Sequence, residues 1–168
     1  MTQRFRPAAL ALFVAAWSLL ATAFAQGINP VAIELQVYVV SQVTRDDGTR
    51  EERFTEASEA RPGQIVEYRL IVRNVGDETL PAGIVVVTGP VPEGTQFVAF
   101  SATPSDDGLL TEFSADRGTT FNETNVFVGQ GEQRRIAEPT RYDAVRWTLL
   151  EEFEPAAELT LVYRVTVR

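Results

Sequence analysis

Near the end of the chain the sequence reads LTLVYRVTV, from Leu159 to Val167, and its residues alternate with a period of two. One set of positions is apolar throughout and consists of Leu159, Leu161, Tyr163, Val165 and Val167. The positions between them include Thr160, Arg164 and Thr166. Because successive side chains of a strand point to opposite faces, this pattern predicts a β-strand with one face in a core.

The same alternation recurs upstream at residues 65–74 and 32–43. In the second of these segments one face holds Ile33, Leu35, Val37 and Val39, and the other holds Glu34, Gln36 and Tyr38. The sequence Asp46-Asp47-Gly48 predicts a tight turn, because Asp-Gly tolerates a positive φ. The polar stretch 49–55 then predicts the returning strand of an N-terminal hairpin. Its charges favour a sheet edge, where charge discourages aggregation.

The middle of the chain, residues 84–137, combines strand patterns with turn-forming and irregular segments. The β-branched run 84–88 is typical of a strand with little solvent on either face, and GPVPEG at 89–94 predicts a rigid connector. We expect further strands at 95–101, 142–150 and, within the irregular region 103–137, near 110–113 and 125–128. No segment after residue 26 has the spacing of an amphipathic helix. Eight or nine short strands predict an all-β fold, an antiparallel β-sandwich, with a single closed sheet as the alternative.

Residues 1–25 predict a signal peptide. Arg4 and Arg6 form a positive region, an apolar run of thirteen residues follows from Ala8 to Leu20, and Ala23-Phe24-Ala25 is a small-x-small cleavage site. The apolar run falls short of the ~20 residues that span a bilayer. We therefore expect residues 26–168 to form one exported domain with no transmembrane anchor after cleavage. Its expected location is the periplasm, the outer cell envelope or the cell surface.

Charge and missing residue types exclude several classes of function. The chain has 15 basic and 23 acidic residues; without Arg4 and Arg6 the balance is 13 − 23 = −10. Such an acidic domain repels phosphate backbones, so we expect no nucleic-acid partner. The sequence contains no cysteine, histidine or lysine. Disulfides, the usual transition-metal sites and most base-assisted nucleophiles are therefore excluded, and we expect a protein that is not an enzyme.

Three segments resemble a known family. They are PGQIVEYRLIVRNVGDETL at 62–80, AGIVVVTGPVPEGTQFVAF at 82–100 and YDAVRWTLLEEFEPAAELTLVYRV at 142–165. Their order, with FSADRGTTF between them, is similar to the bacterial surface-protein repeat domain called DUF11. The resemblance implies an immunoglobulin-like β-sandwich module of exported and cell-surface proteins, with its core at 60–168. Residues 26–59 are then an added N-terminal strand and hairpin.

This chain departs from that family in two respects. Family members often carry Asp where Gly89 stands, and they usually occur as tandem copies, whereas this sequence has a single copy. The single copy points to a stand-alone module and not to a spacer in a long stalk.

Three acidic turns are candidate calcium sites, with Asp46, Asp47, Asp106, Asp107 and Asp116 as the ligands. Calcium takes six to eight hard oxygens, which loops between strands can supply. None of the turns has EF-hand spacing, and Asp and Gly also populate turns for conformational reasons. We therefore expect no cofactor, and calcium stays the alternative.

Two aromatic residues, Tyr38 and Phe100, are candidate partner-binding residues because alternation places them on outward faces. Adjacent carboxylates at Glu51-Glu52 and Glu151-Glu152 do not form catalytic pairs, because neighbours on a strand point to opposite faces. The expected function is a non-enzymatic structural or protein-binding module of a bacterial cell envelope, which recognises an envelope or surface protein. The alternative is a calcium- or carbohydrate-binding domain of the periplasm or cell surface.

Overall fold

The computed structural model describes residues 30–56, 59–129 and 131–168. The predicted signal peptide, residues 1–25, and the next four residues lie outside these ranges. The elements in chain order are β1 (Val31–Thr44), β2 (Arg50–Glu56), β3 (Ile65–Asn74), β4 (Val86–Pro90), β5 (Thr95–Phe97), β6 (Leu109–Ser114), β7 (Phe127–Val128), the 3-10 helix η1 (Gly131–Gln133), β8 (Arg135–Ile136), the 3-10 helix η2 (Pro139–Arg141), β9 (Ala144–Leu149) and β10 (Glu158–Val167).

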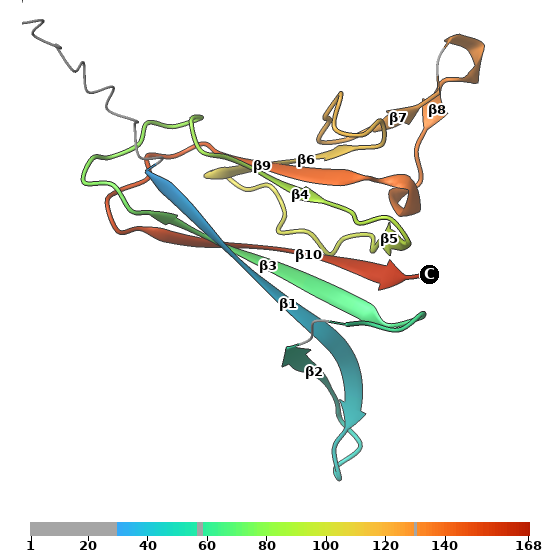
Figure 1. Cartoon of the computed structure of the whole chain (residues 1–168). Helices are drawn as coiled ribbons and strands as arrows, with labels where there is room; N and C mark the ends of the chain where they lie inside the picture. The colour runs from blue at the N-terminus through green and yellow to red at the C-terminus, as the bar shows by residue number, and fades with distance from the viewer. Residues whose placement is uncertain (1–29, 57–58, 130) are drawn as a thin grey trace, which may run out of the picture.

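The strands form two layers, as Figure 1 shows. One layer is a five-stranded sheet in the order β2-β1-β3-β10-β5, and the other is a three-stranded sheet in the order β4-β9-β6. The strands β7 and β8 pair separately. Every pair is antiparallel, and the sheets do not close. The all-β prediction is confirmed, and the alternative of a single closed sheet is wrong.

The core lies between the two layers and is built by the alternation read from the sequence. On β10, Leu161, Tyr163 and Val165 are buried and face the small sheet, as predicted. Trp147 on β9 is 1% exposed, and its ring lies 6.0 Å from that of Tyr163. Tyr163 also stacks on Tyr68 of β3 at 5.0 Å. Burial of the Tyr163 hydroxyl raises its pKa, and the hydroxyl donates a 2.6 Å hydrogen bond to the Pro90 carbonyl.

The glycine at position 89 is required by this packing. A Cβ at Gly89 would lie 2.7 Å from Cε1 of Tyr163 and 3.3 Å from Cζ3 of Trp147. A side chain such as Asp therefore has no room here unless the two rings move. The backbone of β4 approaches the aromatic core directly, which sets the position of this strand over the large sheet.

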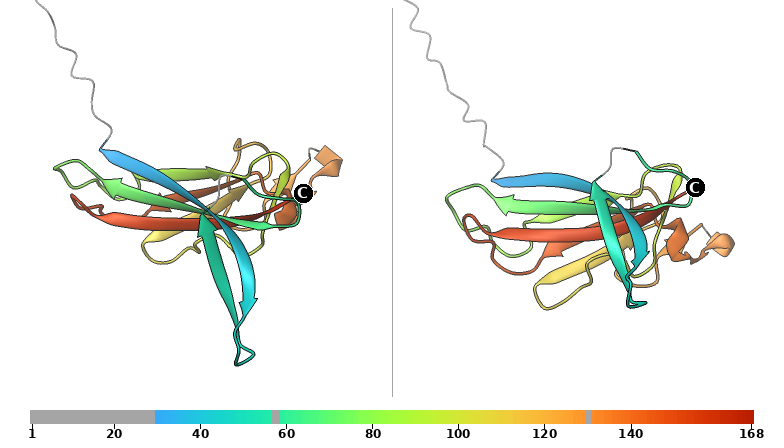
Figure 2. Two further views of the ribbon diagram at one scale, coloured as in Figure 1. Left: turned by 60° about the horizontal axis from the view of Figure 1, so that its bottom comes forward. Right: turned by 90° about the horizontal axis from the view of Figure 1, so that it is seen from below.

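The N-terminal hairpin projects from the outer side of the five-stranded sheet, as Figure 2 shows. Its turn contains Gly48 at φ 82°, as the Asp-Gly signal predicted, and β2 is an edge strand, also as predicted. Arg164 of β10 joins the hairpin to the sheet. Its guanidinium donates to both carboxylate oxygens of Glu52, at 2.8 and 2.7 Å, and its Nε donates to Glu67 at 2.8 Å.

The hairpin buries polar groups that would otherwise face solvent. Glu67 is 3% exposed and accepts from both Arg69 and Arg164. The guanidinium of Arg69 lies 4.6 Å from the ring of Tyr38 and 4.7 Å from that of Phe54. Two cations thus neutralise and cover one buried carboxylate, and aromatic rings from β1 and β2 cover one of the cations.

Two strand predictions were wrong in their surroundings or extent. The strand expected at 84–88 with little solvent on either face is β4 at Val86–Pro90, an edge strand; on its exposed side Ile84, just before it, is 62% and Val86 50% exposed. The strand expected at 95–101 ends at Phe97, after which residues 98–103 follow β10 through backbone bonds from Val98 and Thr103. In both cases pairing with strands far away in the sequence, β9 for the first and β10 for the second, decides the outcome.

We expect Leu161→Ala to lower the free energy of unfolding by about 2–5 kcal/mol, because Leu161 is fully buried and its removal leaves a cavity. The matched variant Leu150→Ala, at a site 44% exposed, should change it by less than about 1 kcal/mol. Urea unfolding of the three proteins measures both differences. Equal losses for the two variants would contradict the position of the core.

The ion pair between Glu52 and Arg164 makes the docking of the hairpin dependent on pH. This pair lowers the pKa of Glu52, so its contribution to stability is present above the unfolded-state pKa of about 4.3 and is lost as the pH falls through the lower folded-state pKa. We expect Glu52→Gln to destabilise the protein at pH 7 by up to about 1 kcal/mol. At pH 2 the variant and the natural protein should have equal unfolding free energies.

The control for this experiment is Glu56→Gln. Glu56 lies on the same strand and makes no ion pair with any described residue. Its substitution should leave the dependence of stability on pH unchanged. A Glu52→Gln effect of the same size at pH 2 and pH 7 would show that the ion pair is not its cause.

Candidate functional site

The most unusual side chain on the surface is Phe100, in the segment that follows β5. Its exposed fraction is 102%, and its backbone has φ 61°. The segment is anchored on both sides of Phe100, by hydrogen bonds from the Val98 N–H to the Arg164 carbonyl at 2.9 Å and from the Thr103 N–H to the Val162 carbonyl at 2.8 Å. The benzyl side chain is therefore presented to solvent from a backbone held against the edge of β10.

This conformation is unfavourable for folding. The left-handed region costs a residue other than glycine about 1–2 kcal/mol. An exposed phenyl ring gains nothing from the hydrophobic effect in return, and a buried Phe typically gains about 1.5–3 kcal/mol. Strained residues of this kind cluster at binding sites, where the surrounding structure holds them in place.

Phe100 lies at an apolar hollow of about 380 Å³. The lining residues come from four parts of the chain and are Ala99, Phe100, Ala102, Pro104, Ser105, Thr111, Phe113, Glu123, Thr124 and Pro139. Glu123 is the charged residue among them. The hollow is therefore lined mainly by apolar groups, with one carboxylate, that of Glu123.

The wall of the hollow is rigid because an aromatic cluster supports it. Phe113 of β6 lies 5.1 Å from the ring of Tyr142 and 5.5 Å from that of Phe97. Burial of Tyr142, together with the nearby Glu138 carboxylate, raises the pKa of its hydroxyl. Phe97 itself is 3% exposed. We call the hollow and Phe100 together the Phe100 site.

The other aromatic candidate, Tyr38, is placed differently. It lies on the outer face of β1 and is half-buried, under the guanidinium of Arg69 and beside Phe54, whose ring centroid is 6.4 Å away. Its hydroxyl donates to Gln36 at 3.0 Å. Tyr38 thus contributes to the docking of the hairpin, and the structure does not bring it together with Phe100.

The aspartates of the acidic turns act within their own turns. Asp47 accepts from the N–H and hydroxyl of Thr49, which lowers its pKa, and Asp106 accepts from the N–H of Gly108. Asp116 accepts from the N–H and hydroxyl of Thr120, which likewise lowers its pKa. These are the local bonds that favour Asp in turns.

The structure does not bring the three turns together. Asp46 and Asp47 are at the tip of the hairpin, which points away from the two layers (Figure 2). Asp106 and Asp107 line a separate hollow of about 450 Å³ with Glu151. In the part of the chain that the structure describes, no three carboxylates are grouped as ligands for a metal ion.

Sequence reasoning missed Asp143, which lies just before β9. One oxygen, Oδ2, accepts a 2.6 Å hydrogen bond from the N–H of Arg117, a residue at φ 62°. The other, Oδ1, is buried and has no hydrogen-bond partner among the described residues. Because the contact joins residues 26 positions apart through the pairing of β6 with β9, no local pattern could have predicted it.

Comparisons with known proteins give no match: no family model, no curated protein and no solved structure is similar to this chain. Among the described residues, no helix has the length and hydrophobicity needed to cross a bilayer.

We expect Phe100→Gly to leave the free energy of unfolding unchanged or to raise it by up to about 1 kcal/mol. Glycine removes the left-handed strain of about 1–2 kcal/mol, and its greater backbone entropy offsets part of that gain. The matched variant Phe97→Ala, three positions away and buried, should cost about 3–5 kcal/mol. Thermal unfolding of both variants checks the pair. A large loss for Phe100→Gly would mean that Phe100 serves the fold.

Proposed function

We propose that this protein is an exported, non-enzymatic, protein-binding module of a bacterial cell envelope or cell surface, with an immunoglobulin-like β-sandwich fold. Three observations support the proposal. The first 25 residues have the order of a secretory signal peptide. The chain is all-β in two facing layers. The segments at 62–80, 82–100 and 142–165 resemble the DUF11 surface domain.

The observation that carries the proposal is Phe100. A fully exposed phenyl ring, held at φ 61° by bonds on both sides, stands beside an apolar hollow with a rigid wall. Anchors of protein interfaces have this form, since a few aromatic side chains near a pocket provide most of the binding free energy. A fixed anchor also loses little conformational entropy when it binds.

A protein partner fits this site better than a charged ligand does. Phe100 projects outward, so its ring has to enter a pocket on the partner, while an apolar side chain of the partner can enter the hollow. Both contacts bury hydrocarbon, which contributes about 25 cal/mol per Å² removed from water. The Glu123 carboxylate at the hollow favours a basic or hydroxyl group on the partner.

The test is affinity capture from a gently cross-linked envelope fraction of the source cells, with a tag after Arg168. We expect a partner protein at near-stoichiometric yield with the natural sequence and at least a tenfold lower yield with Phe100→Ala, because hot-spot truncations cost ≥ 2 kcal/mol. The control is Ile136→Ala on β8, which removes a side chain that is 60% exposed outside the site. This variant should capture the partner protein at the same yield as the natural sequence.

Equal capture by Phe100→Ala would show that the partner binds elsewhere. An empty capture with a monomeric protein would favour the alternative of a small ligand. Calcium would then raise the melting temperature relative to chelator, or a glycan array would show binding that Phe100→Ala removes.

A further inference from the structure

The five-stranded sheet is wider than the three-stranded sheet that faces it, and this leaves a shelf on its inner face. In the register of β1 and β3, Ile33 lies opposite Val72 and Leu35 opposite Leu70, so these side chains share one face. Val72 and Leu70 are buried, whereas Ile33 is 51% and Leu35 56% exposed. We call the uncovered surface over Ile33 and Leu35 the β1 shelf. It is one strand wide, because β2 joins β1 only from Tyr38 onward.

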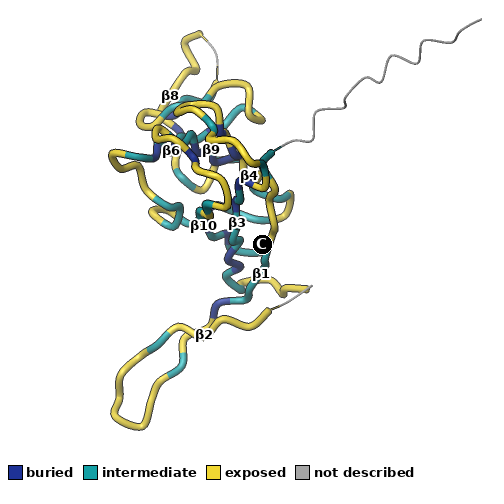
Figure 3. Tube along the Cα trace, turned by 90° about the vertical axis from the view of Figure 1, so that its left-hand side faces the viewer, coloured by how far each residue is buried: buried dark blue, intermediate teal, exposed yellow. Residues whose placement is uncertain are grey.

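The edge of the small sheet beside this shelf is β4, and Figure 3 shows β4 and β1 on the same side of the two layers. Leu149 of β9 donates to the carbonyl of Val85 at 3.0 Å, and hydrogen-bonded positions alternate along an antiparallel ladder. Val87 therefore also bonds to β9, while Val86 and Thr88 turn their N–H and C=O groups away from it. These four groups bond to no described residue.

This edge has no charged guard against strand pairing. Natural edges are guarded by charge, proline, short length or a covering segment. The prolines here are at 81, 90 and 92, outside the stretch from Val86 to Thr88. The edge strand β2 carries four charges in the run REER, and the part of β1 that β2 does not reach carries Glu34. From Leu80 to Pro92 the sequence LPAGIVVVTGPVP has no charged residue. The outer face of β4 is also apolar, with Ile84 and Val86 exposed.

We propose that the free edge of β4 accepts an extended segment of another protein as a fourth strand of the small sheet. Its backbone bonds to the N–H and C=O groups of Val86 and Thr88. Every second side chain points inward and covers Ile33 and Leu35. The added strand thus completes both the hydrogen-bond ladder and the cover of the β1 shelf. This surface does not depend on the Phe100 site, which follows β5 at the other edge of the large sheet.

The width of the shelf favours a lone strand over a second copy of this chain. Two copies joined through their β4 edges in antiparallel pairing would place both large sheets on the same side of the continuous small sheet. Each β1 projects beyond its own β4, so the two β1 strands would occupy the same space. A segment with no second layer attached fits beside β4 without that collision.

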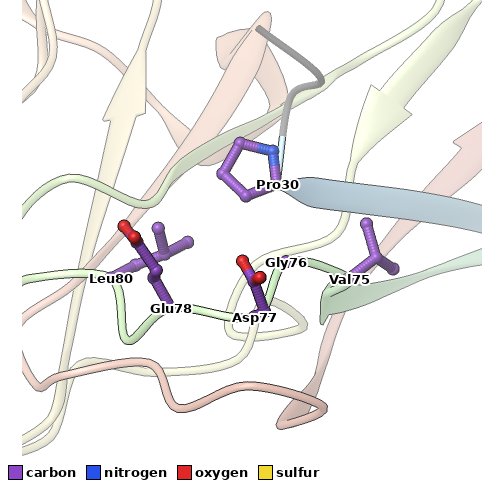
Figure 4. Close-up of a pocket in the computed structure, with 6 residues that line it drawn as sticks. All are labelled: Pro30, Val75, Gly76, Asp77, Glu78 and Leu80. Atoms are coloured by element: carbon purple, nitrogen blue, oxygen red, sulfur yellow. The ribbon is translucent and has the colours of Figure 1, made fainter.

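Charge at one end of the shelf indicates a feature of the incoming segment. A hollow of about 570 Å³ lies where β1 begins and is lined by Pro30, Val75, Gly76, Asp77, Glu78 and Leu80. Figure 4 shows the side chains of Asp77 and Glu78 rising toward the side of Pro30. Neither carboxylate has an ion pair with a described residue. A strand antiparallel to β4 runs toward this hollow, so a basic residue at its C-terminal end pairs with them.

The test uses a synthetic peptide of eleven residues with valine at every second position, serine or threonine between them, and two arginines at the C-terminal end. Amide hydrogen exchange of the isotope-labelled protein is followed by NMR with and without peptide. In the free protein the amides of Val86 and Thr88 should exchange fast. Bound peptide should slow both, because each amide gains a hydrogen-bond acceptor.

Substitutions at Thr88 separate edge pairing from other modes of binding. Thr88→Pro removes an N–H that makes no bond within the fold and places a ring in the path of the added strand, and proline is tolerated at such edge positions. We expect peptide affinity to fall at least tenfold in Thr88→Pro and to be unchanged in the matched variant Thr88→Ala. Leu35→Asp, at an exposed position of the β1 shelf, should cause a similar loss of peptide affinity. This variant replaces Thr88→Pro in the test if Thr88→Pro does not fold.

The proposal is overturned if the peptide does not bind at millimolar concentration or if Thr88→Pro, or in its place Leu35→Asp, binds as Thr88→Ala does. It also fails if the amides of Val86 and Thr88 are already protected in the free protein. Analytical ultracentrifugation then shows whether a second copy of the chain covers the edge. In that case the protein sediments as a dimer, and Leu35→Asp or Thr88→Pro dissociates it. Phe100→Ala should bind the peptide normally, so failure at this edge and failure at the Phe100 site are distinguishable.

Discussion

The contact of Trp147 with Tyr163 and the backbone of Gly89 is the interaction on which the rest of the structure depends. The indole and phenol rings join the two sheets, and the missing side chain at Gly89 lets β4 lie against them. The indole N–H donates to the carbonyl of Thr103 at 3.1 Å, which fixes one end of the segment that carries Phe100. A single buried side chain thus positions both the free edge of β4 and the exposed phenyl ring.

Arginine chemistry organises the outer face of the large sheet. Arg164 reaches two carboxylates at once, with a fork on Glu52 and its Nε on Glu67, a geometry that the point charge of lysine does not provide. Glu67 is buried only because two guanidinium groups accompany it. In this chain without lysine, planar cations join the hairpin to the sheet, and one of them, Arg69, also lies over the rings of Tyr38 and Phe54.

Sequence reasoning predicted the strands well and their surroundings less well. Period-two alternation depends on the geometry of the chain itself, so Leu161, Tyr163 and Val165 were assigned to the core correctly. The exposure of Ile33 and Leu35 depends on how many strands the opposite sheet has, which no local pattern encodes. Alternation did indicate an outward side for Phe100. Its left-handed backbone and the hollow beside it arise from anchoring to β10 and from β6, far along the chain.

The two long strands beside β3 also determine how this fold bears force. β1 and β10 run in the same direction, one on each side of β3; β1 starts level with Asn74, and β10 ends past Ile65. Tension applied between Val31 and Arg168 therefore acts along the strands and loads the hydrogen bonds on both sides of β3 together, in shear. The fold thus resists tension along this axis through two hydrogen-bond ladders at once.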